Sequence, residues 1–118
     1  MNVIIYSDEQ QNNFEEMLIS NDEAMVRSFP TAEITNYKDV NPSVMIFDMP
    51  LEKVKEVCAV TKFDSGLLVV VDEIPENLTV RAEAFDYIKR PVNPIELGVR
   101  VEALGKVMKY KNGLKTIA

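Results

Sequence analysis

The sequence predicts an α/β fold, a doubly wound five-stranded parallel sheet with helices on both faces. Three short, wholly apolar runs have the pattern of strands that are buried on both sides; they are 3–6, 44–47 and 67–71. Two weaker strand candidates, 24–28 and 85–88, bring the number of strands to five, and segments with helical apolar spacing alternate with the strands to give five strand–helix units. Short crossovers between parallel strands are right-handed, so the helices come to cover both faces of the sheet.

The composition limits the kinds of function that are open to the chain. Its 118 residues, 47% apolar and 27% charged, are those of one soluble globular domain. A net charge of −6 argues against nucleic acid or an anionic membrane as the direct ligand. With no histidine and the single cysteine Cys58, a zinc site, a Cys-His or Ser-His pair and an internal disulfide are excluded.

The sequence leads us to expect neither a signal peptide nor a membrane span. The longest wholly apolar run, 67–71, is too short to span a bilayer. The N-terminus runs directly into a strand without the basic segment of a signal peptide. We therefore expect a cytoplasmic protein.

The first two strand–helix units differ in how clearly they can be assigned. Residues 3–6 form the first strand, and a helix should follow over about 10–20. The next segment allows two interpretations. In the preferred one, residues 24–28 are the second strand and a weak helix runs from 30 or 31 to about 40. In the other, residues 32–36 are the strand and the helix is missing.

The central strand is Val44–Phe47, which ends in Asp48. Pro50 is a favourable residue for the first turn of a helix, and a helix is predicted from there to about Lys62. Its apolar stripe includes Cys58, which we interpret as a small buried hydrophobe.

The following segments complete the sheet. Residues 64–66, Asp-Ser-Gly, are predicted as a turn, and 67–71 as the fourth strand. A short helix is expected over 75–84 and a brief fifth strand over 85–88.

The last helix has a strong start signal, because Asn93 can act as N-cap, Pro94 occupies the first turn and Glu96 follows. It is predicted to end near Lys109, so that residues 1–109 form the domain and 110–118 a tail or linker. Four lysines near its end are interpreted as a solvated helix terminus that complements the helix dipole; they are Lys106, Lys109, Lys111 and Lys115.

The apolar stripe of this helix is wider than one buried face requires. Its inward positions are Leu97, Val101, Leu104 and Met108, and Ile95, Val99 and Val107 lie beside them. Two interpretations stay open at this point, an exposed patch or a wide stripe that is wholly buried.

Charged residues follow the strands at what should be one edge of the sheet. Acids come after the first, third and fourth strands, and a cation comes after the fifth; they are Asp8 with Glu9, Asp48, Asp72 with Glu73, and Lys89 with Arg90. Ligands and chemistry gather outside the carboxyl ends of parallel strands. Like charges this close raise one another's pKa unless a cation offsets them. We therefore expect a functional site, or the remnant of one, at this edge.

The stretch 82–97, Ala-Glu-Ala-Phe-Asp-Tyr-Ile-Lys-Arg-Pro-Val-Asn-Pro-Ile-Glu-Leu, is similar to the run around the fifth strand of receiver domains. The chain resembles these domains of bacterial two-component response regulators over nearly its whole length. The distance from Glu23 to Asp48 suits the family's second strand and helix, which supports the first interpretation above. The resemblance implies the strand order 2-1-3-4-5, a cis peptide bond between Arg90 and Pro91, and protein partners such as a histidine kinase or an effector domain.

The resemblance also implies roles for residues at the edge. Asp48 lies where the family's aspartate accepts a phosphoryl group. Asp8 lies in the position of an acid that holds Mg²⁺. Asp72 and Arg90 lie where a hydroxyl residue and a lysine normally contact phosphoryl oxygens, and Tyr87 lies at the switch aromatic.

Several of these positions depart from the family's pattern. Ser7 replaces the second acid, and Glu9 could substitute for it only by bending back, so we expect weakened Mg²⁺ binding. Asp72 places a negative charge where phosphoryl oxygens would lie, and Arg90 brings a wider, bidentate group than lysine. Lys89 should point to the other side of its strand. The loop after Asp48 is shortened and has no glycine.

These departures favour a divergent receiver-like signalling module over a working phosphoacceptor. We expect Arg90 to pair with Asp48, Asp72 or both, and phosphorylation to be weak or absent. Contact with effectors, or a homodimer, would use the family's surface of helix 4, strand 5 and helix 5, and no enzymatic turnover is expected. The alternatives are a phosphorylation-competent receiver that uses Asp48 and a flavodoxin-like ligand-binding domain, although no glycine follows the first strand.

Overall fold

The computed structural model describes residues 1–9, 13–18, 24–76 and 82–117, and it contains the predicted parallel sheet. The five strands are β1 (Asn2–Ser7), β2 (Met25–Phe29), β3 (Val44–Asp48), β4 (Phe63–Val71) and β5 (Ala82–Lys89). They run parallel in the order β2-β1-β3-β4-β5, as predicted. The central strands are buried on both faces because each face carries its own apolar cluster.

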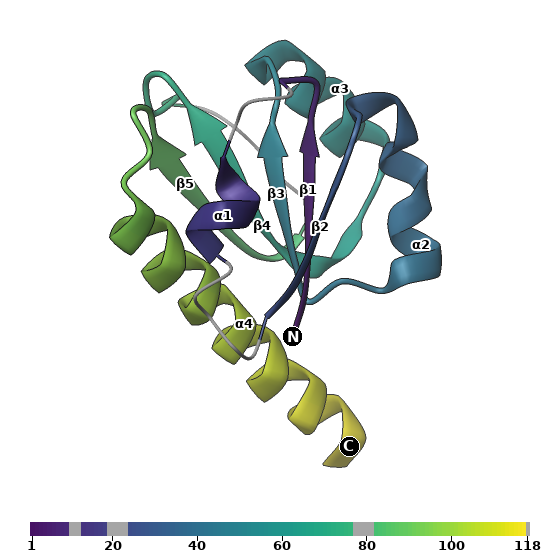
Figure 1. The fold of residues 1–118 in the computed structure, drawn as a ribbon. Coiled ribbons are helices and arrows are strands. Elements are labelled where there is room, and N and C mark those ends of the chain that lie inside the picture. Colours follow the sequence, from purple (N-terminus) through teal and green to yellow (C-terminus); the bar gives the residue numbers. More distant parts are fainter. Residues whose placement is uncertain (10–12, 19–23, 77–81, 118) are drawn as a thin grey trace.

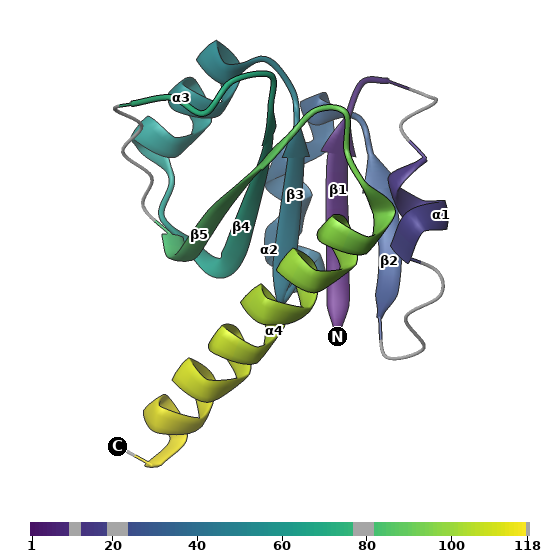
Figure 2. The same ribbon diagram turned by 90° about the vertical axis from the view of Figure 1, so that its left-hand side faces the viewer.

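Helices cover the two faces of the sheet as separate layers (Figures 1 and 2). α1 (Phe14–Leu18) and α4 (Pro94–Ile117) cover one face. The 3-10 helix η1 (Thr31–Asn36), α2 (Tyr37–Val40) and α3 (Leu51–Val60) cover the other. None of the helices in the described ranges combines the length and the apolar composition that crossing a membrane requires.

The preferred interpretation of the second strand–helix unit, in which the strand comes first and a weak helix follows it, is confirmed. β2 occupies Met25–Phe29 and pairs with β1, with Val26 beside Val3. The helical segment after it begins as a 3-10 helix at Thr31 and becomes α-helical only at Tyr37. The predicted first helix over 10–20 is seen as α1 over Phe14–Leu18, and its remaining residues outside 13–18 lie beyond the described parts.

The turn predicted over 64–66 is wrong, because β4 already begins at Phe63. The Ser65 hydroxyl donates to the Pro42 carbonyl at 2.6 Å and the Gly66 N–H donates to the Ser43 carbonyl at 2.9 Å. A Cβ on Gly66 would stand 3.2 Å from the Cβ of Leu104. The glycine therefore permits close approach of α4, and tertiary packing outweighs the local turn signal.

The ends of the other elements also differ from prediction. α3 is shorter than predicted, and Pro75 and Glu76 are not helical. Ala82–Ala84 belong to β5, where Ala84 pairs with Gly66, while 77–81 lie outside the described residues. α4 continues to Ile117 and includes Gly113, instead of ending near Lys109. One glycine costs a helix only about 1 kcal/mol relative to alanine. The last turns of α4 extend past the sheet (Figures 1 and 2).

Candidate functional site

The carboxyl ends of β1, β3 and β4 and the residue after β5 meet at one edge of the sheet, where they line a cleft of about 860 Å³. The structure thereby brings the predicted charged residues together; the cleft is lined by Asp8, Glu9, Asp48, Asp72, Glu73 and Arg90, with Met49, Pro50, Leu51, Val70 and Val71. The parallel register explains this, because it places the ends of neighbouring strands level with one another.

Asp48 is the last residue of β3, and its side chain is only 2% exposed. The register sets Ser7 of β1 directly beside it. The Ser7 hydroxyl donates to Oδ2 of Asp48 at 2.8 Å, and Nη2 of Arg90 donates to Oδ1. Both oxygens of this buried carboxylate therefore have partners within the chain, as burial of a charge requires.

Arg90 joins the ends of three strands. Its backbone N–H donates to the Val71 carbonyl at 2.8 Å, which holds it beside the end of β4. Nη2 contacts Asp48 and Nη1 lies 3.3 Å from Oδ1 of Asp72. The predicted ion pair with both acids is therefore present. The peptide bond from Arg90 to Pro91 is cis, as predicted.

The two acids further stabilise the charged form of Arg90. Its partial burial acts to lower the pKa of the guanidinium, but the hydrogen bond and charge of Asp48, supported by Asp72, outweigh this and raise the pKa. The two contacts differ in their surroundings, because the Asp72 side chain is 84% exposed. The contact with Asp48 is consequently the stronger of the two. Lys89 is exposed, on the other side of the strand from this site.

Asp8 is engaged in a different set of contacts. Its carboxylate accepts hydrogen bonds from the Thr31 backbone N–H at 2.9 Å and from the Thr31 hydroxyl at 2.6 Å. Nζ of Lys53 in turn donates to Oγ1 of Thr31 at 2.7 Å. These bonds, the side-chain bond first, lower the pKa of Asp8. Asp8 therefore caps η1 from the end of β1.

Thr31 and Lys53 are site residues that the sequence analysis missed. Thr31 is buried although it carries a hydroxyl, and it follows Pro30 at the start of a helical segment, where capping contacts are common. That position is the signal in the sequence that could have identified it. Lys53 lies in the first turn of α3, and no local pattern distinguishes it from other lysines.

The carboxylates at this edge do not fit a Mg²⁺ site well. Mg²⁺ is held by carboxylate and water oxygens in near-octahedral geometry. Both oxygens of Asp48 and both oxygens of Asp8 already accept hydrogen bonds from side chains or backbone of the same chain. Within the described ranges no group of three or more His, Cys, Asp or Glu side chains is arranged to bind a metal ion. Glu9, which was considered as a substitute for the missing acid at position 7, contacts Ser7 through its backbone, where its N–H donates to the Ser7 hydroxyl at 3.1 Å.

Tyr87 lies on β5 and faces the side of the sheet that α3 covers. Its ring packs edge-on against Phe85, with centroids 4.6 Å apart. Burial raises the pKa of Tyr87, and nearby Cys58 adds to this. Cys58 is buried in the same apolar cluster, and burial raises the pKa of its thiol to about 11. It is therefore an uncharged, buried side chain at neutral pH.

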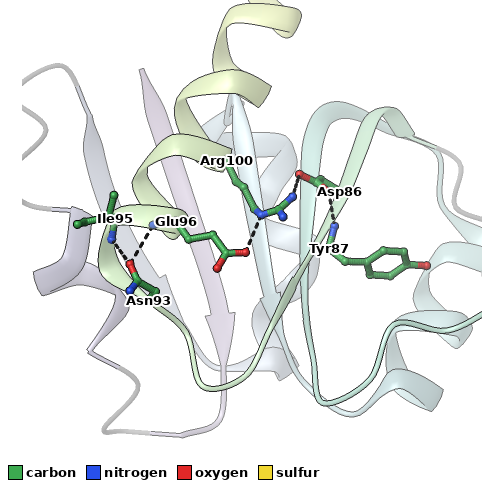
Figure 3. A network of polar contacts seen from close by, with 6 residues as sticks. All are labelled: Asp86, Tyr87, Asn93, Ile95, Glu96 and Arg100. Atoms are coloured by element: carbon green, nitrogen blue, oxygen red, sulfur yellow. Dashed lines mark hydrogen bonds and ion pairs between the residues drawn. The ribbon is translucent and has the colours of Figure 1, made fainter.

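A second polar network holds the start of α4 against β5 (Figure 3). Arg100 donates from Nη1 to Asp86 at 2.7 Å and from Nε to Glu96 at 3.1 Å. The Asn93 side chain accepts from the N–H groups of Ile95 and Glu96 at 2.9 and 3.2 Å, which confirms it as the N-cap. Glu96 pairs with Arg100, so its side chain serves the contact between α4 and β5.

A scan against protein-family models and a search of curated proteins both find no match for this chain.

Proposed function

We propose that this chain is a receiver-like signalling module that acts through protein–protein contact, with weak or no phosphorylation of Asp48. One observation carries the proposal, namely that both carboxylate oxygens of Asp48 are bound by side chains of the same chain. The strand order and the position of Asp48 at the end of the middle strand support the receiver-like part.

Phosphoryl transfer depends on positioning of the reacting atoms and on neutralisation of charge. A carboxylate oxygen has to approach phosphorus freely, and a divalent cation usually offsets the charge of the phosphoryl oxygens. Here Oδ1 of Asp48 is held by Arg90, and Asp72 contributes a negative charge beside the same guanidinium. Each of these features works against acceptance of a phosphoryl group.

Arg90 supplies Asp48 with the positive charge that a metal ion would otherwise supply. Because it contacts acids from β3 and β4 and itself follows β5, it holds three strand ends in one arrangement without phosphate. The module then presents a constant surface to its protein partner, which is an effector domain or a histidine kinase. No catalytic turnover by the chain is involved.

The test is to incubate the domain with Mg²⁺ and a small phosphodonor such as acetyl phosphate and to measure intact mass. We expect no stoichiometric adduct, and no spectral change with beryllofluoride. A triple variant, Ser7→Asp with Asp72→Ser and Arg90→Lys, restores the family's residue types and should gain an adduct that Asp48→Asn removes. Stoichiometric labelling of Asp48 in the unaltered domain would overturn the proposal.

The second candidate is a phosphorylation-competent receiver that uses Asp48, with Asp8 and Glu9 for Mg²⁺. The size of the cleft favours it, because about 860 Å³ leaves room for a phosphoryl group next to Arg90. The Arg90 side chain is also 33% exposed, so the guanidinium can exchange its partners with solvent. The same labelling experiment separates the two candidates.

A further inference from the structure

Helix α4 carries exposed apolar side chains beside its buried face. The inward face is packed against the sheet; its residues are Leu97, Val101, Leu104 and Met108. Other large apolar side chains of the helix lie in solvent, with exposed fractions between 42% and 78%; they are Ile95, Val99, Val107 and Tyr110. Of the two interpretations of the wide stripe, the exposed patch is therefore confirmed.

The charge of the chain is divided between the end of this helix and everything before it. Four of the 13 cationic side chains and none of the 19 acids follow Glu102. Residues 103–118 therefore carry a charge of +4, whereas residues 1–102 carry −10. The net charge of −6 argues against an anionic ligand only for the chain taken as a whole, and it conceals this division.

In the last turns of α4 the lysines border the exposed apolar side chains. Val107 and Tyr110 are three residues apart, so they lie on one side of the helix. At about 100° per residue, Lys106 and Lys111 occupy the two flanks of this side. The side chain of Lys106 is 76% exposed, and Lys109 is exposed as well. An apolar strip between lysines is typical of a helix that lies at a membrane surface.

The basic turns lie at the far end of the molecule from the acidic cleft. They extend past the edge of the sheet at which the strands begin, while the cleft with Asp48 and Asp72 lies at the edge where the strands end (Figures 1 and 2). The six residues of β1 separate the two edges by roughly 17 Å. Exposed charges farther apart than the Debye length, about 8 Å at physiological ionic strength, are largely screened. The lysines can therefore meet an anionic surface while the acids of the cleft face away from it.

The apolar side chains favour a lipid surface over other anionic partners. Nucleic acid is bound through phosphate contacts and through bases stacked on aromatic rings, which leaves Val107 without a role. In a bilayer interface the aliphatic side chain enters the apolar boundary, and the ring and hydroxyl of Tyr110 suit its two environments. The contact of Lys106 with Glu102, at 3.1 Å, is an exposed i,i+4 pair, weak enough for Lys106 to exchange it for a lipid headgroup.

We propose that the last turns of α4, from Lys106 onward, dock the domain on the surface of an anionic lipid bilayer. Val107 and Tyr110 enter the interface, and Lys106 and Lys109 contact the charged headgroups. The helix lies on the membrane and does not cross it. This inference goes beyond the proposed function, because it concerns the place at which the module acts. Its test needs no phosphodonor, so it fails or succeeds separately from the labelling of Asp48.

The first test is co-sedimentation of the full chain with vesicles, either of phosphatidylcholine alone or of phosphatidylserine and phosphatidylcholine in equal parts. We expect the chain to bind the anionic vesicles, less so as salt is raised, and to bind the neutral ones little. The double variant Lys106→Gln with Lys109→Gln should lower the partition coefficient at least about tenfold, because each lysine near an anionic surface contributes about fivefold.

The matched control is the double variant Lys55→Gln with Lys89→Gln. It changes the net charge by the same amount, and its two exposed lysines lie on α3 and at the end of β5. Circular dichroism shows that each variant is folded. Absence of binding to the anionic vesicles, or equal losses in the two double variants, would overturn the proposal.

The second test reports whether the apolar side of the helix enters the bilayer. The chain has no tryptophan, so Tyr110→Trp introduces a single fluorescent reporter. We expect its emission to shift to the blue with anionic vesicles, whereas Val60→Trp, at a position 85% exposed on α3, should show no shift. Binding to polyglutamate or to a duplex oligonucleotide that is as tight as binding to the vesicles, with no blue shift, would assign the lysines to other polyanions and overturn the proposal.

Discussion

The ion pair between Arg90 and Asp48 leads to the sharpest prediction for stability. Arg90→Met keeps an unbranched side chain of similar reach but removes the guanidinium. Among the described residues, the Asp48 carboxylate, 2% exposed, then keeps the Ser7 hydroxyl as its remaining side-chain donor. Removal of one partner from a buried pair costs about 3–5 kcal/mol. Because the Arg90 side chain is 33% exposed, water can enter in its place, and we expect about 2 kcal/mol.

The contact with Asp72 should contribute far less. Asp72 is 84% exposed, and surface ion pairs contribute about 0–1 kcal/mol. Asp72→Asn should therefore lower the free energy of unfolding by no more than about 0.5 kcal/mol. Comparison of the two variants separates the buried contact of the same arginine from its exposed contact.

The assay is urea unfolding followed by circular dichroism, because the chain has no tryptophan. A loss of about 2 kcal/mol corresponds to a fall of about 8 °C in the midpoint of thermal unfolding for a domain of this size. Lys89→Met is the control, since Lys89 is the exposed neighbour. In the double variant with Asp48→Asn, the effect of Arg90→Met should shrink. If Arg90→Met costs no more than Lys89→Met, the reasoning about the buried carboxylate is refuted.

Three further predictions concern other parts of the chain. Because the pKa of Asp8 is lowered in the folded state, its ionised carboxylate stabilises the fold above the ordinary pKa of 3.8, and this stability is lost as the pH falls toward the folded-state pKa. Thr31→Val removes one hydrogen bond to Asp8 and should make the free energy of unfolding, measured by urea titration, less dependent on acid pH. Gly66→Ala should lower the free energy of unfolding by about 1–3 kcal/mol through overpacking. Gly98→Ala has open space around the new Cβ and should raise the free energy of unfolding by about 0.5–1 kcal/mol. A destabilising effect of Gly98→Ala would contradict this expectation. Cys58 should react with a thiol reagent at pH 7 only after unfolding, and rapid native labelling would show that its burial has been misjudged.

The fold could be predicted largely because the strands carry strong signals. The uninterrupted apolar runs around Val44 and Leu67 mark strands that are buried on both faces, and their number and alternation with helices define the architecture. The errors occurred where local signals and packing disagree. Asp64, Ser65 and Gly66 have the composition of a turn, yet they extend β4 because Gly66 lies beneath α4.

The sequence was enough to predict which charged residues meet at the site, but only some of the contacts that they make. The shared edge of parallel strands places Asp48, Asp72 and Arg90 together, and the chemistry of guanidinium and carboxylate makes them pair. The hydrogen bonds from Thr31 to Asp8, and from Lys53 to Thr31, depend on how η1 and α3 pack beside β1. Such long-range geometry leaves no periodic signal in the sequence.

The guanidinium of Arg90 is a ligand that belongs to the chain it binds. A phosphoryl group arrives from a donor, persists for a limited lifetime and leaves by hydrolysis, so a signal based on it is driven by chemical energy and decays. The charge of Arg90 comes from no donor and is not removed by hydrolysis. Its effective concentration at Asp48 is set by the fold alone. Under the proposed function, any change of state has to come from binding elsewhere on the surface. Such a response is an equilibrium and is therefore reciprocal. If binding of a partner changes the equilibrium constant of the contact between Arg90 and Asp48 by some factor, then making or breaking that contact changes the affinity for the partner by the same factor.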